Sequence, residues 1–118
     1  MKICVLGIWH LGSVTATCLS SLNNNVVALD YDKKLIKDLN NCIFPVQEPK
    51  LNEIAKKSFK KKRLRFIDSA NEIPKNLDYI WVTYDTPVNY QDKSDISYVK
   101  KNIIKTLNRI TKPIPVII

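Results

Sequence analysis

Hydrophobic residues in this chain form short unbroken runs that alternate with longer stretches of helical periodicity. The runs at 3–6 and 26–29 are continuously apolar, as is typical of parallel strands covered on both faces. Between them, apolar positions recur at steps of three and four, which predicts a helix over 11–22. We expect this helix to turn one stripe towards the sheet, made of Leu11, Val14, Thr15, Cys18, Leu19 and Leu22.

The middle of the chain continues the same alternation. The pattern predicts a helix capped by Asp32, then a helix that buries a stripe over 51–59, then a short strand at 64–67 near a sheet edge. Ser69 is placed to cap a single turn. Strands that alternate with helices in this way are typical of parallel sheets with right-handed crossovers.

The last third predicts a strand at 77–82, a helix that Ser94 or Asp95 caps and Pro113 ends, and a further buried strand at 114–118. The whole order of elements predicts an α/β fold, a Rossmann-type doubly wound parallel sheet with three α/β/α layers. A natural domain seldom stops inside an apolar strand. We therefore interpret residues 1–118 as one domain at the front of a longer protein.

Gly7 and Gly12, the only two glycines, both follow the first apolar run, which indicates backbone geometry that a Cβ would forbid. Their spacing is that of the strand, turn and helix that open a dinucleotide-binding unit. Trp9 stands where the middle glycine of the usual G-x-G-x-x-G pattern would be. Its ring either obstructs the approach of a pyrophosphate or points away and leaves the N–H groups of the helix start free.

Polar residues directly after two of the predicted strands are candidate cofactor contacts. Asp30 follows the second strand, 18 residues after Gly12, where a carboxylate accepts hydrogen bonds from ribose hydroxyls and repels a 2′-phosphate. This favours NAD over NADP. The alternative role for Asp30 is a helix cap, for which Asp32 is better placed. Thr86 lies at the carboxyl edge after the strand at 77–82.

Composition adds few constraints. A chain of 118 residues with 45% hydrophobic and 25% charged residues is typical of one soluble domain, and neither a membrane span nor a signal peptide is evident. We therefore predict a cytoplasmic protein without a membrane partner. Cys4, Cys18 and Cys42 lack metal-ligand spacing and are predicted to be reduced, with Cys4 and Cys18 buried.

The net charge of +8 has two interpretations. Many of the cations crowd the end of one predicted helix and the turn after it: Lys56, Lys57, Lys60, Lys61, Lys62, Arg63 and Arg65. They form either a patch for nucleic acid or membrane, or a solvated helix end whose cations suit the helix dipole. We favour the second and predict no nucleic-acid partner.

Several blocks together resemble the UDP-glucose/GDP-mannose dehydrogenase family, the nucleotide-sugar 6-dehydrogenases. They are the opening Met1 to Gly7 with Leu11-Gly12, the Asp-x-Asp of Asp30 and Asp32, Pro45 with Glu48-Pro49, Arg63 to Phe66, Thr86-Pro87, and Asp95 to Val99. The resemblance covers essentially the whole chain. The sequence differs from the family pattern at Leu35, where a basic residue is usual, and at Lys50, where a glycine is usual.

The resemblance implies an enzyme with an N-terminal NAD-binding domain, a central dimerising segment and a C-terminal nucleotide-sugar domain. Such enzymes oxidise the sugar C6 alcohol to a carboxylate in two NAD-dependent steps, using a cysteine that lies downstream of Ile118. The parent protein is then a homodimer that binds a nucleotide sugar. The chain itself carries no predicted catalytic residue and no metal site.

Carried over by position, the resemblance assigns the pyrophosphate turn to Gly7, Trp9, His10, Leu11 and Gly12, and the ribose contact to Asp30. A cofactor-side loop comprises Tyr84, Asp85, Thr86 and Pro87. His10, the only histidine, is interpreted as packing at the helix start rather than as a catalytic group.

A second hypothesis keeps the fold without the cofactor. In it, Trp9 signals lost NAD binding, and the basic segment from Lys56 to Arg65 meets an anionic partner. Whether the chain acts within an enzyme therefore stays open at the level of sequence.

Overall fold

The computed structural model describes residues 1–45, 48, 50–84, 93–110 and 113–117. These residues build a parallel five-stranded sheet in the order β3-β2-β1-β4-β5. The strands are β1 (Lys2–Leu6), β2 (Asn25–Leu29), β3 (Leu64–Ile67), β4 (Tyr79–Val82) and β5 (Val116–Ile117). The order reverses at β1, so the carboxyl ends of β1, β2 and β4 meet at the switch point where ligands bind in open α/β sheets.

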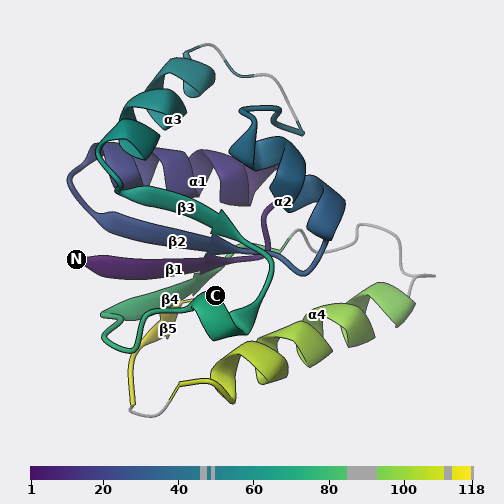
Figure 1. The fold of residues 1–118 in the computed structure, drawn as a ribbon. Coiled ribbons are helices and arrows are strands. Elements are labelled where there is room, and N and C mark those ends of the chain that lie inside the picture. Colours follow the sequence, from purple (N-terminus) through teal and green to yellow (C-terminus); the bar gives the residue numbers. More distant parts are fainter. Residues whose placement is uncertain (46–47, 49, 85–92, 111–112, 118) are drawn as a thin grey trace.

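Helices cover both faces of the sheet, which confirms the predicted three-layer α/β/α arrangement (Figure 1). One face carries α1 (His10–Ser21), α2 (Lys33–Asn40) and α3 (Leu51–Lys60). The other carries α4 (Lys93–Leu107) and the short 3₁₀ helix η1 (Ala70–Glu72). Asp32 caps α2 and Ser69 caps η1, as predicted.

Successive strand residues point to opposite faces, so the sheet separates two apolar cores. The core under α1, α2 and α3 contains Ile3, Val5, Val26, Ala28 and Phe66. The core under α4 contains Cys4, Leu6, Val27, Leu29 and Ile80. Strands buried on both faces explain why the runs at 3–6 and 26–29 are continuously apolar.

The predicted inward stripe of α1 is wrong for most of its residues, although Leu19 packs against the core as predicted. Leu11 and Leu22 are exposed by 55% and 71%, and Cys18 is exposed as well. The helix instead buries small residues, namely Gly12, Ser13, Ala16, Thr17 and Ser20. Since α1 packs against both the sheet and its neighbour α3, small side chains on this stripe allow the backbones to approach closely. The hydroxyl of Ser20 contacts that of Ser58 on α3 at 2.8 Å.

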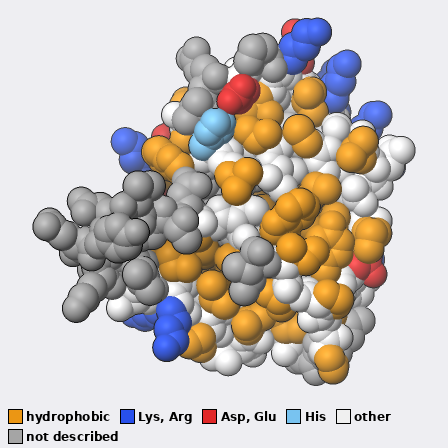
Figure 2. All heavy atoms as spheres, turned by 180° about the vertical axis from the view of Figure 1, so that it is seen from behind, with side chains coloured by type: hydrophobic (Ala, Val, Ile, Leu, Met, Phe, Trp, Pro, Cys, Tyr) orange, Lys and Arg blue, Asp and Glu red, His pale blue; other side chains and the backbone are white. Residues whose placement is uncertain are grey.

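Three predictions about the end of the chain also fail. Helix α4 begins at Lys93, which places Ser94 and Asp95 inside its first turn, and it ends at Leu107, before Pro113. Val116 and Ile117 of β5 are 38% and 43% exposed rather than buried, because β5 is an edge strand. Figure 2 shows hydrophobic side chains gathered on the face turned away from the view of Figure 1.

No helix among the described residues is long and apolar enough to cross a membrane. The described part of the chain also holds no group of three or more side chains able to bind a metal ion. The three cysteines are free thiols, and burial raises the pKa of Cys4 to about 12. Cys4 is therefore a packed, unreactive thiol.

Candidate functional site

The turn after β1 depends on Gly7. Its φ is +89°, a conformation that residues with a side chain rarely adopt. Its N–H donates to the carbonyl of Leu29 at 2.9 Å, which ties the turn to the end of β2. A Cβ at this position would lie 2.6 Å from the ring of Tyr84. A side chain at position 7 is therefore excluded both by the backbone and by the neighbouring ring.

Gly12 lies in the first turn of α1 and faces back onto the same turn. A Cβ there would collide with the carbonyl oxygen of Gly7 and would lie 2.7 Å from the hydroxyl of Thr83. The helix start and the end of β1 are thus in direct backbone contact. Both glycines have the role that the sequence predicts, because each occupies a place that a Cβ would fill.

Thr83 is a site residue that sequence reasoning missed. Its N–H donates to the carbonyl of Leu6 at 2.8 Å, and its hydroxyl donates to the carbonyl of Gly7 at 2.8 Å. The side chain is 2% exposed. Its position as the first polar residue after the strand that pairs with β1 is the signal that could have found it.

The N-terminus of α1 has no side-chain cap. Trp9 is the N-cap residue and makes no capping hydrogen bond, and the first turn holds no acidic residue. The N–H groups of His10, Leu11 and Gly12 therefore lie at the positive end of the helix dipole without a capping side chain. The side chain of Trp9 is 54% exposed, so its ring is not part of either core.

Asp30 is buried beside this turn with only 7% of its surface exposed. Its Oδ2 accepts from the N–H of Ile8 at 2.8 Å, and its Oδ1 accepts from the N–H of Asp32 at 2.9 Å. Burial raises the pKa of Asp30, and the two backbone hydrogen bonds oppose that shift. Asp30 thus joins the end of β2 to the turn, while capping falls to Asp32, whose Oδ1 accepts from the N–H of Leu35.

Tyr84 follows Thr83 and covers the turn from the β4 side, with its ring against Gly7. Burial raises the pKa of the Tyr84 phenol, and the nearby Asp30 carboxylate adds to the shift. The phenol is therefore neutral at physiological pH. Asp85 and Thr86, the two other loop residues predicted to contact the cofactor, lie outside the described residues.

His10, at the first position of α1, is not simply packed against the helix start. Its Nε2 lies 2.7 Å from Oε1 of Glu48, and the two side chains are 42% and 41% exposed. Figure 2 shows the pale blue histidine against a red acidic side chain at the surface. The contact links the start of α1 to the segment before α3.

These parts together can hold an anion and a neighbouring hydroxyl-bearing group. Uncapped helix N–H groups bind phosphates, glycines allow the backbone to approach closely, and a carboxylate at the end of β2 can accept ribose hydroxyls. The fold and the turn define a Rossmann-type dinucleotide-binding domain.

Comparison with known proteins identifies the family. The chain belongs to the UDP-glucose/GDP-mannose dehydrogenase family, whose NAD-binding domain matches residues 1–118. The cofactor of this domain is NAD. The chain is 34% identical over 102 residues to the UDP-glucose 6-dehydrogenase TuaD of Bacillus subtilis, a match that covers 84% of this chain and 22% of that protein. It is 33% identical over 118 residues to the UDP-glucose 6-dehydrogenase of Rickettsia bellii, covering all of this chain and 27% of the relative.

Solved structures agree on the fold. A UDP-D-ManNAc dehydrogenase from Pyrococcus horikoshii superposes with a TM-score of 0.86 at 25% identity, covering 98% of this chain and 27% of that one. A GDP-mannose dehydrogenase from Pseudomonas aeruginosa gives a TM-score of 0.82 at 23% identity, with the same coverage. The chain thus spans about a quarter of the length of these proteins.

Proposed function

We propose that this chain supplies the NAD-binding portion of a nucleotide-sugar 6-dehydrogenase, which oxidises the C6 alcohol of a UDP-sugar to a uronate. The observation that carries the proposal is the turn between β1 and α1. There, two glycines bring an uncapped helix N-terminus into contact with the strand end, beside a buried carboxylate. The UDP-glucose 6-dehydrogenases among the relatives support the choice of substrate class.

Each residue of the turn has a defined part in this proposal. The N–H groups at the start of α1 hold the pyrophosphate, with Gly7 and Gly12 providing the space. Asp30 accepts the adenosine ribose hydroxyls through lone pairs that remain on its two oxygens. Bound NAD supplies the hydride acceptor for the oxidation. Asp85 and Thr86 remain predicted contacts on the cofactor side.

Catalysis and substrate binding are assigned to other parts of the parent enzyme. The chain's three thiols match no catalytic cysteine of the resembled family, so we propose that this portion alone binds cofactor without turning over substrate. The parent enzyme is proposed to be a cytoplasmic homodimer that binds its nucleotide sugar through a downstream domain.

Calorimetric titration of the 118-residue chain with NAD⁺ tests the proposal. We expect saturable binding that Asp30→Ala weakens, because the ribose loses its acceptor. Asp78→Ala is the matched control, since Asp78 also accepts a backbone N–H, from Lys2, but at the opposite end of the sheet. No heat at millimolar NAD⁺, with the chain folded by circular dichroism, would support a non-catalytic interaction module instead.

Trp9→Gly tests whether the indole obstructs the turn. Because the side chain is half exposed, we expect the affinity for NAD⁺ to change by less than about threefold, which is under 1 kcal/mol. A gain of tenfold or more would show that the ring blocks the pyrophosphate. The same calorimetric titration measures both outcomes.

A further inference from the structure

A cavity lies on the α4 face of the sheet, beyond the carboxyl ends of β2 and β3. Its volume is about 340 Å³, and three cations from separate elements line it: Lys33 at the start of α2, Lys105 on α4 and Arg109 after α4. We propose that this cationic cavity binds a small phosphate-bearing metabolite, at a site separate from the dinucleotide turn.

None of the three cations pairs with a carboxylate among the described residues, where the one ion pair within 4 Å joins His10 and Glu48. Asp68 is the single acidic residue on the wall of the cavity. The lining therefore carries a net charge of about +2, which a phosphate dianion would neutralise.

The walls of the cavity are held in place by contacts of their own. The ammonium of Lys105 lies 4.3 Å from the ring centre of Tyr31, a cation–π contact. The hydroxyl of Tyr31 lies 2.9 Å from that of Thr106, which fixes the ring against α4. Lys105 is thus positioned at the cavity before any ligand arrives, which lowers the entropic cost of binding.

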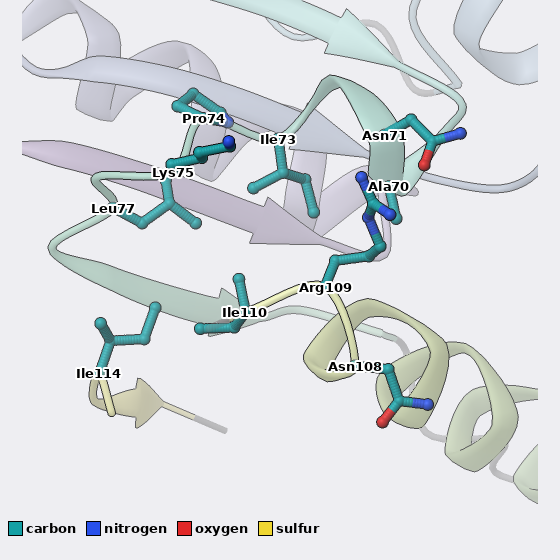
Figure 3. A pocket seen from close by; sticks show the side chains of 10 residues that line it. All are labelled: Ala70, Asn71, Ile73, Pro74, Lys75, Leu77, Asn108, Arg109, Ile110 and Ile114. Atoms are coloured by element: carbon teal, nitrogen blue, oxygen red, sulfur yellow. The ribbon is translucent and has the colours of Figure 1, made fainter. Parts of the chain in front are cut away.

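Arg109 also lines a second cavity of about 250 Å³, whose walls include Ile73, Leu77 and Ile110 together with Lys75 and Asn108. Figure 3 shows the Arg109 side chain extending from the end of α4 to η1, beside Ala70. The Arg109 side chain therefore lines both cavities. We assign the phosphate to the 340 Å³ cavity, where Lys33 and Lys105 also line the wall.

The shape of the cavity and its polar groups narrow the class of ligand. A half-open cavity of this size suits a small molecule rather than a polymer lying on a flat surface. Asp68 and Asn71 can bind hydroxyl groups of the ligand beside its phosphate. These observations favour a phosphorylated sugar or polyol over a simple inorganic anion.

The cavity and the turn lie on opposite sides of one short segment. Asp30 turns its carboxylate to the N–H of Ile8, towards α1, whereas Tyr31 packs in the core under α4. A ligand in the cationic cavity therefore need not displace a dinucleotide at the turn.

Calorimetric titration of the 118-residue chain with glucose 6-phosphate, with glucose as the uncharged comparison, tests this site. We expect saturable binding of the phosphate ester and none of glucose. The double variant Lys105→Gln/Arg109→Gln should weaken binding at least about tenfold, which corresponds to 1.4 kcal/mol. Both side chains are exposed, so the variant should keep the fold, which circular dichroism checks.

The matched control is Lys60→Gln/Lys61→Gln, which removes the same charge at the exposed end of α3. Equal weakening by both double variants would show that only net charge acts and would overturn the site. Absence of binding to the unmodified chain would overturn it too. A final titration in saturating NAD⁺ should give an unchanged affinity for glucose 6-phosphate, and competition would overturn the claim of separate sites.

Discussion

The glycine turn and the cationic cavity lie at the same end of the sheet, yet they are built from different parts of the polypeptide. The turn consists mainly of backbone: N–H groups, carbonyls and two positions without a side chain. The cations of the cavity are long side chains contributed by separate elements, and the segment 68–71 completes its wall. A single added methyl group should therefore disrupt the turn, whereas the cavity should tolerate substitution without loss of fold.

Gly12→Ala should have the largest effect on stability. The added Cβ collides with the carbonyl of Gly7 and the hydroxyl of Thr83, and that carbonyl cannot easily move away because hydrogen bonds to Leu29 and Thr83 hold Gly7 in place. We expect the free energy of unfolding to fall by about 3 kcal/mol, the upper part of the usual range for overpacking. Urea denaturation measures it. Cys18→Ala, on the exposed side of the same helix, is the control and should change stability little. A fall below about 1 kcal/mol for Gly12→Ala would contradict the close contact.

Asp30→Ala should have an intermediate effect. It leaves the N–H groups of Ile8 and Asp32 without their acceptor in a buried place, which costs about 1–3 kcal/mol. Asp78→Ala should cost less, because water can replace that exposed acceptor. Equal losses in urea denaturation would argue against a buried role for Asp30.

The pH dependence of the Asp30 effect has a defined sign. Burial raises the pKa of Asp30 above the ordinary 3.8, so the folded state holds this proton more tightly than the unfolded state does. The part of the stability that depends on this proton is fully present below pH 3.8 and is lost as the pH rises through the raised pKa, whereas the hydrogen bonds to Ile8 and Asp32 contribute separately. The difference between the unmodified chain and Asp30→Ala should therefore narrow from acid pH towards neutrality. A difference that widens would contradict the raised pKa.

Glu48→Gln should have the smallest effect. The contact between His10 and Glu48 joins two partly exposed side chains, and such pairs contribute at most about 1 kcal/mol. We expect the free energy of unfolding to change by less than about 0.5 kcal/mol. A loss similar to that of Gly12→Ala would mean that side chains, and not only backbone, hold the turn together.

The fold could be predicted from the sequence because strands covered on both faces leave a strong signal. Unbroken apolar runs locate β1 and β2. Asp32 and Ser69 correctly predict the N-caps of α2 and η1. Helix α1 could not be oriented in the same way. Hydrophobic periodicity assumes that large apolar residues face inward, whereas close packing against both the sheet and α3 selects small ones such as Ala16 and Ser20.

Site residues could be predicted from the sequence where the residue type has a special backbone property. They could not be predicted where a residue acts through a contact with a distant part of the chain. Gly7 and Gly12 are visible because glycine is so rare in this chain. Thr83 is not, because its role is to hold the carbonyl of a residue 76 positions away, and only the pairing of β1 with β4 brings the two together. The contact between His10 and Glu48 spans 38 positions and is equally invisible in the sequence.

The hydrogen bonds of Gly7, Ile8 and Thr83 have a further consequence for how the turn would respond to a ligand. Together they fasten the end of β1 and the turn after it to the ends of two neighbouring strands, to β2 through Leu29 and Asp30 and to β4 through Thr83. A stretch secured in this way has few conformations left to lose, so it receives a ligand in its final shape. Amide hydrogen exchange at these positions should already be slow in the free chain and should change little when a dinucleotide binds.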